Sequence, residues 1–141
     1  MAEGGAPPEY KLIDADGQEK TSSHGYTGRG TAHYPNGDTY AGDFLDGKRH
    51  GQGDYTYART NPEEEPIQYK GAWVDNNKHG IDKQMYPKCG EYYGYWEAGE
   101  RHGEGVMTYT NKDVYSGNWA NGKKDGQGTY IYFKTGEKYV G

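Results

Sequence analysis

The chain has 141 residues and a formal charge of −5 at pH 7, a length that allows one ordinary domain or one short array of repeats. The acidic balance argues against nucleic acid as a partner, because phosphate backbones select basic surfaces, and no apolar run approaches the roughly 18 residues of a transmembrane helix. Hydrophobic residues make up only 31%, but there are 24 glycines and 16 tyrosines. Because tyrosine joins a large packing ring to a polar tip, this composition favours a thin, aromatic-faced structure over disorder.

The first segment in chain order, residues 1–27, is predicted as an N-terminal leader, and the sequence leaves open whether it is ordered. Its first eight residues lack the apolar core of a signal peptide. Cys89 is the only cysteine of the chain, which excludes a disulfide framework and suits a reducing compartment. We therefore expect an intracellular protein.

From residue 28 to residue 141 one pattern recurs. A degenerate unit around Gly28–Gly30 comes first. Four units then open on a tyrosine, at spacings of 29, 23 and 23 residues, and a fifth tyrosine opens a unit that breaks off at Gly141. These tyrosines are Tyr40, Tyr69, Tyr92, Tyr115 and Tyr139. We predict a repeat array over residues 28–141, with about four full units flanked by partial ones.

Within each unit the pattern has a period of two, which indicates strands. Tyr40, Gly42 and Phe44 fall on one face, and a glycine such as Gly47 marks the turn between two halves of the unit. This predicts hairpins with strands near 39–45 and 52–57 and almost no helix. Since the connections are short throughout, the predicted fold is all-β: a single-layer twisted antiparallel meander of stacked hairpins, with about ten strands.

The recurring glycines predict how such a sheet buries its rings. Gly42, Gly71, Gly94 and Gly117 leave room for the ring of a neighbouring strand to lie over the backbone. The aromatic face then serves as the core, and where its rings are not used by each other it serves as a binding surface. The candidate binding residues are Tyr40, Phe44, Tyr55, Tyr57, Tyr69, Trp73, Tyr92, Trp96, Tyr109, Tyr115, Trp119, Tyr130 and Tyr132.

The consensus Tyr-x-Gly-x-Trp-x-x-Gly-x-x-His-Gly-x-Gly-x-Tyr resembles the MORN (membrane occupation and recognition nexus) repeat over about residues 28–141. Three stretches further resemble the radial spoke head MORN proteins of cilia and flagella: residues 36–40, 47–53 and 128–141. That resemblance implies a structural scaffold in the radial spoke head of the axoneme, with other radial spoke head proteins as partners.

Some positions depart from the consensus. Asp82 replaces the second glycine of its unit, and Gln84 stands where other units have tyrosine. The hairpin that contains them is therefore predicted to be the least regular. Thr27 and Asp125 replace the turn histidine, so that histidine is not essential to the fold.

No catalytic constellation emerges. Equivalent histidines of successive units, such as His50 and His79, are two strands and thus about 10 Å apart, which is too far for one zinc ion. Ser22, Ser23 and Ser116 are the only serines, and none lies in a nucleophile elbow. We expect a non-enzymatic protein that needs no metal and no cofactor.

A membrane-associated module that binds anionic phospholipid is the first alternative. Six basic residues gather along the turn edge: Lys48, Arg49, Lys78, Arg101, Lys123 and Lys124. The same turns contain five acidic residues: Asp46, Asp75, Glu97, Glu100 and Asp125. Because lipid recognition usually relies on four to eight basic residues without such compensation, protein–protein contact is preferred.

Two further possibilities remain. The repeats could be the targeting segment of a longer enzyme, since the last unit is incomplete. The open ends of the sheet could also take an added strand or a second copy of the chain.

Overall fold

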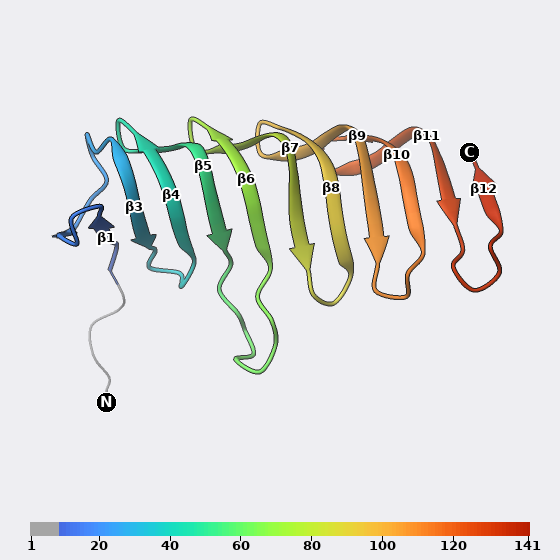
Figure 1. Ribbon diagram of the computed structural model, residues 1–141, viewed down its shortest axis with the longest axis horizontal. Helices are drawn as coiled ribbons and strands as arrows, with labels where there is room; N and C mark the ends of the chain where they lie inside the picture. The colour runs from blue at the N-terminus through green and yellow to red at the C-terminus, as the bar shows by residue number, and fades with distance from the viewer. Residues whose placement is uncertain (1–8) are drawn as a thin grey trace.

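One open antiparallel sheet contains all twelve strands of the computed structural model, which describes residues 9–141 (Figure 1). From one edge to the other the order is β12 to β3 in reverse chain order, followed by β1 and β2. The strands are β1 (Lys11–Asp14), β2 (Glu19–Lys20), β3 (Gly28–His33), β4 (Thr39–Leu45), β5 (Lys48–Thr56), β6 (Gln68–Val74), β7 (Asn77–Tyr86), β8 (Gly90–Glu97), β9 (Glu100–Tyr109), β10 (Val114–Ala120), β11 (Lys123–Ile131) and β12 (Lys138–Val140). The predicted all-β meander is confirmed, and no segment of this range forms a helix that could span a membrane.

The hairpin turns are two-residue turns in which both residues have positive φ. Asp46 and Gly47 have φ of 49° and 82°, and Ala98 and Gly99 have φ of 50° and 85°. Two positive φ angles in a row define a type I′ turn, whose twist matches that of the flanking strands. The turn glycines predicted from the sequence therefore occupy the positions that favour glycine.

Each of the four long hairpins bends sharply near its turn. A register shift interrupts the pairing of the two strands, for example between Gly42 and Phe44 in the β4–β5 hairpin. On the opposite strand, Gly51 has a φ of 93°, the conformation that bends a bulged strand. Figure 1 shows the turns along the upper edge crossing over their neighbours, and the Asn76 amide donates to the Arg49 carbonyl at 3.0 Å, which links one turn to the next.

A continuous row of edge-to-face rings forms the core on one face of the sheet. Trp96 lies between Tyr69 and Tyr92, with ring centroids 5.3 and 5.2 Å apart. Trp119 lies between Tyr92 and Tyr115 in the same way, at 5.2 and 5.5 Å. Such pairs each contribute about 0.5–1.5 kcal/mol beyond the burial of their area. Each unit thus shares its rings with the next, as nearest-neighbour stability of a repeat protein requires.

The glycines serve this core in a different way from the one predicted. The tyrosine that opens a unit covers the second glycine of its own unit: a Cβ atom at Gly105 would overlap the Tyr92 ring. Gly94 instead faces the backbone of Gly105 across the strand pair, and a Cβ atom there would also lie 2.7 Å from the Tyr92 hydroxyl oxygen. The expectation that the ring of a neighbouring strand lies over Gly94 was therefore wrong: the nearby ring is that of Tyr92, on the same strand, and it reaches across the hairpin to Gly105.

The β6–β7 hairpin differs from the others, in agreement with the prediction that it is the least regular. Its register shift begins at Lys70, before the central glycine, whereas in the β8–β9 hairpin the central Gly94–Gly105 pair is kept. The Asp82 carboxylate occupies the space beside Gly71 and accepts a hydrogen bond from the Tyr69 hydroxyl at 2.8 Å. Asp82 thus compensates for the missing glycine by binding the ring's hydroxyl group.

The sheet extends into residues 1–27, which were predicted to form an N-terminal leader. Strands β1 and β2 pair with each other, and β1 pairs with β3 through four residues. Leu12 of β1 is fully buried and joins the core cluster. Residues 1–8 of the predicted leader lie outside the described residues.

Candidate contact surfaces

The structure divides the predicted binding residues into two groups. Eight of them belong to the buried core: Tyr40, Phe44, Tyr69, Trp73, Tyr92, Trp96, Tyr115 and Trp119. Four are partly buried against that core, namely Tyr55, Tyr57, Tyr109 and Tyr130. Tyr132 is 45% exposed. On the folded chain the partly buried rings and Tyr132 are accessible, and the buried group forms the core.

A row of basic side chains covers the aromatic face, with one member in each unit. The Arg101 guanidinium lies 4.7 Å from the centroid of the Trp119 ring, and the Lys78 ammonium lies 4.8 Å from that of Trp96. Arg49 lies over Trp73 at 4.9 Å and Lys124 over Tyr115 at 4.7 Å. We call Arg49, Lys78, Arg101 and Lys124 the cation row. Because long basic side chains bury their aliphatic stems on apolar surfaces, the row supplies the cover that a single-layer sheet otherwise lacks.

The cation row corrects the expectation that these four residues line the turn edge with Lys48 and Lys123. Each member directly opposes the large ring of its own hairpin in the strand register, as Arg101 opposes Trp96. Lys48 and Lys123, one residue earlier in their units, are exposed, and Lys124 is exposed as well although it lies over the Tyr115 ring. The alternation of side chains along the strand could have separated the two groups, but the bend near the turn concealed the period.

Hydrogen bonds hold the Arg49 and Lys78 side chains of the cation row in place. Arg49 donates to the Tyr34 hydroxyl at 2.9 Å and to the Asn76 carbonyl at 3.0 Å. Lys78 donates to the Gln84 side-chain oxygen at 2.6 Å. Burial, assisted by repulsion from Arg101 and Arg49, lowers the pKa of Lys78 to about 8, because a buried ammonium loses its hydration.

Two hollows open beside the cation row. One of about 500 Å³ is lined by the rings of Tyr86 and Trp119 and by Arg101 and Lys124. A smaller one of about 230 Å³ lies between Arg49 and Lys78. The larger hollow combines apolar walls with three positive charges, since Lys123 also lines it, and the smaller one has two. The aromatic face therefore offers concave surfaces that suit anionic groups.

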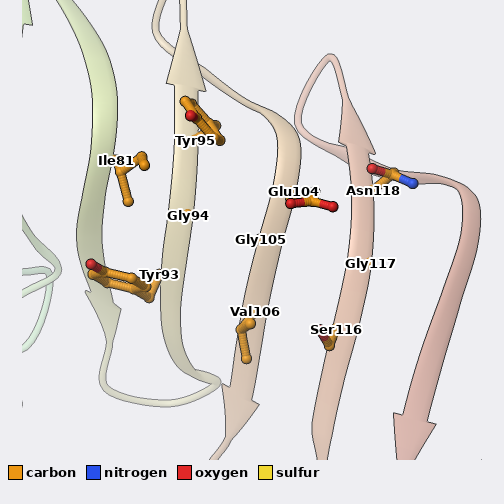
Figure 2. Close-up of a pocket in the computed structure, with 10 residues that line it drawn as sticks. All are labelled: Ile81, Tyr93, Gly94, Tyr95, Glu104, Gly105, Val106, Ser116, Gly117 and Asn118. Atoms are coloured by element: carbon orange, nitrogen blue, oxygen red, sulfur yellow. The ribbon is translucent and has the colours of Figure 1, made fainter.

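The opposite face carries an exposed apolar patch that the sequence analysis did not consider. Figure 2 shows Ile81, Tyr93, Tyr95 and Val106 projecting from β7, β8 and β9 around a hollow of about 360 Å³. Ile81 is 50%, Tyr93 53% and Tyr95 48% exposed. The backbone of Gly94, Gly105 and Gly117 forms part of the floor of the hollow. Large exposed apolar patches commonly mark interaction surfaces. The signal was the alternation of Tyr93 and Tyr95 with the buried rings of β8.

The polar residues that invited other interpretations are placed as follows. His50 faces Asp75 at 3.8 Å and His102 faces Glu97 at 3.6 Å, both near hairpin turns. Over residues 9–141 no three possible ligand side chains come together as a metal site would require. In the inserted loop, Glu64 pairs with Lys88 at 3.0 Å.

Comparison with known families gives five matches to a family model described as MORN repeat, which together cover more than half of the chain. They span residues 23–39, 40–59, 69–81, 92–114 and 115–134. The shortest match ends at Ile81, just before the aspartate that replaces the second glycine. A search of curated proteins found no match.

Proposed function

The chain belongs to the MORN repeat family, and from that premise we propose that it is a non-catalytic scaffold that acts by protein–protein contact in the radial spoke head of the ciliary axoneme. The repeats themselves indicate a module for protein interaction or membrane binding. Since repeat folds host many functions, the choice between these two depends on the surfaces of this chain.

The cation row favours protein contact over lipid binding. Of the six basic residues that would attract an anionic membrane from the turn edge, four lie against aromatic rings instead. Lys48, Lys123 and Lys124 remain exposed, and Lys48 belongs to a hairpin that two others separate from the hairpin of Lys123 and Lys124. Surface attraction to anionic lipid is worth about 1 kcal/mol per nearby basic residue, and one lysine in one hairpin with two in a distant one is fewer than the clusters of four to eight that lipid recognition uses. This distribution of charge is the observation that carries the proposal.

The apolar patch supplies a surface for such contact. Ile81, Tyr93 and Tyr95 are about half exposed and project from adjacent strands, and aromatic residues on rigid strands are frequent anchors of protein interfaces. The assignment to the spoke head is supported by the resemblance of residues 36–40, 47–53 and 128–141 to radial spoke head MORN proteins. Other spoke-head proteins are the partners that this assignment implies.

The test combines incorporation into axonemes with binding to vesicles. A tagged chain expressed in ciliated cells is expected to enter axonemes and to recover spoke-head subunits. Tyr93→Ser with Tyr95→Ser, which changes only exposed side chains, should reduce that recovery without lowering thermal stability. Lys48→Glu with Lys123→Glu serves as the control and should incorporate normally. Strong sedimentation of the purified chain with phosphoinositide vesicles, lost in the control variant, would instead support the membrane function.

A further inference from the structure

Over residues 9–141, no acidic side chain forms an ion pair with a member of the cation row. Among the described residues, the basic side chains in ion pairs are others: Lys11, Lys20, Arg29, His50, Lys83, Lys88 and His102. Yet the chain carries 21 acidic against 16 basic residues, a formal charge of −5. Four cations without an ion-pair partner among the described residues thus lie on one face of an acidic protein. Their grouping results from the fold and not from the composition.

Partial burial of Arg49, Lys78 and Arg101 makes this arrangement costly. The Nε atom of Arg49 is buried and has no hydrogen-bond partner, although a buried guanidinium normally satisfies its donors. Repulsion from Arg49 and Arg101 contributes to the lowered pKa of Lys78. An anion bound between neighbouring members would oppose that repulsion, since opposite charges within a few ångströms favour the charged form of a base.

The spacing of the row defines the ligand. Members of successive hairpins lie two strands apart, which corresponds to about 10 Å along the sheet. Seven residues of an α-helix rise about 10.5 Å and return to the same face, whereas three residues of an extended strand cover the distance but end on the opposite face. Carboxylates at every seventh position of a helix therefore match the row, and apolar residues between them match the ring-lined hollows.

We propose that the cation row is a docking site for an acidic segment of a partner protein, with carboxylates repeated at about 10 Å. The inference rests on the proposed function, because it specifies one of the contacts by which the scaffold holds other proteins. Charge complementarity selects the acidic occupant, and the narrow, ring-walled hollows select side chains over a flat bilayer surface.

The first test uses two fluorescent helical peptides with equal numbers of glutamates, placed at every seventh or at every fifth residue. Fluorescence anisotropy with the full chain should show binding of the first peptide at least about tenfold tighter than binding of the second. Arg101→Gln with Lys124→Gln should weaken the first peptide about tenfold. Lys48→Gln with Lys70→Gln removes the same charge at exposed positions that line neither hollow and should change binding less than twofold.

The second test uses pH and needs no destabilising variant. Because the Lys78 pKa is about 8 and the anion binds the protonated amine, peptide affinity should fall as pH rises through that value. Lys78→Arg, which keeps its charge, should abolish the fall. Failure of the wild-type chain to bind the first peptide, or equal loss in both glutamine pairs, would overturn the proposal. Binding of phosphatidylserine vesicles by the cation row, without binding of the first peptide, would show that the row recognises lipid instead. Neither result would affect the proposed function, because recovery of spoke-head subunits through the apolar patch is measured separately.

Discussion

A tyrosine hydroxyl and two facing glycines form the recurrent contact at the scale of single residues. In the β8–β9 hairpin the Tyr92 ring lies over Gly105, and its hydroxyl donates to the Tyr95 carbonyl at 2.9 Å. The ring is fully buried in a strand pair that is one layer thick. Glycine is therefore required at this position for space and not for an unusual φ angle.

Gly105→Ala is expected to lower the free energy of unfolding by about 1–3 kcal/mol, because the added methyl group overlaps the Tyr92 ring and overpacking of a dense core costs that much. Chemical denaturation followed by tryptophan fluorescence measures the change. Ser116→Ala, at an exposed position of the adjacent strand, is the matched control. Equal stability of both variants would contradict the account of the glycine.

A second residue-scale prediction concerns the β8–β9 turn. Ala98 has a φ of 50°, and the equivalent turn position holds Asp46 or Asn121 in other hairpins. The left-handed region costs most residues about 1–2 kcal/mol, whereas asparagine tolerates it. Ala98→Asn should therefore raise the melting temperature, and Asn121→Ala should lower it. A decrease in both variants would exclude turn strain as the cause.

Sequence reasoning was correct about which residues recur but not about which ring covers which glycine. Period two places Tyr92, Gly94 and Gly105 on one face, and it does not say whether a ring leans toward its own hairpin or the next. In the structure the Tyr92 ring covers Gly105 of its own hairpin, and its hydroxyl bonds to the Tyr95 carbonyl at the register shift beyond Gly94. Bulges of this kind leave no separate signal in a single sequence.

At the scale of the hairpin, the cation row shows how one element covers its neighbour. Lys78 belongs to the β6–β7 hairpin and Arg101 to the β8–β9 hairpin. Each lies over the tryptophan of the hairpin that follows its own. The basic position of one unit and the aromatic position of the next therefore form one contact. The sequence predicted these residues along the turn edge and did not predict their contacts with the rings, because the bend near the turn is a property of the paired strands.

Arg101→Ala is expected to lower the free energy of unfolding by about 1–2 kcal/mol through loss of its cation–π contact and of the stem that covers Trp119. Lys123→Ala removes an exposed charge at the turn of the following hairpin and should change the free energy of unfolding by less than about 0.5 kcal/mol. Thermal denaturation at neutral pH compares the two. If both variants melt together with the wild type, the row does not cover the core.

Across the whole molecule, stability depends on keeping many phenols neutral. Burial raises the pKa of Tyr92 to about 12, and burial, assisted by Tyr86 and Asp38, raises that of Tyr57 to about 12. Tyr40 and Tyr69 are shifted in the same direction. Because the unfolded phenols ionise near a pKa of 10, the unfolded chain releases these protons before the folded one does.

The protein should therefore unfold in alkali. A group whose pKa is raised by folding stabilises the fold fully below its unfolded pKa, and this stabilisation is lost as pH rises toward the folded pKa. The melting temperature is expected to fall steeply between pH 10 and about 12, and tyrosinate absorbance should appear together with the loss of sheet circular dichroism. Tyrosinate signal from the buried rings before any loss of structure would contradict this expectation.

The all-β meander, the hairpins and the turn glycines could be predicted from the sequence, since they follow from local periodicity and turn chemistry. The apolar patch around Tyr93 and Tyr95 was missed, because exposed rings and core rings alternate in one strand and only the register tells which face is covered. Strands β1 and β2 lack the repeat pattern, so they could not be predicted from the periodicity of the sequence.

The direction of the strands has a mechanical consequence. Figure 1 shows the long axis of the molecule running across the strands, so the backbone hydrogen bonds of the antiparallel ladder lie along that axis. A pull between the two ends of the sheet loads these bonds in tension one strand pair at a time, as in a zipper, and not in shear all together. Under such a pull the chain should lengthen hairpin by hairpin at low force, which makes the sheet compliant along its long axis.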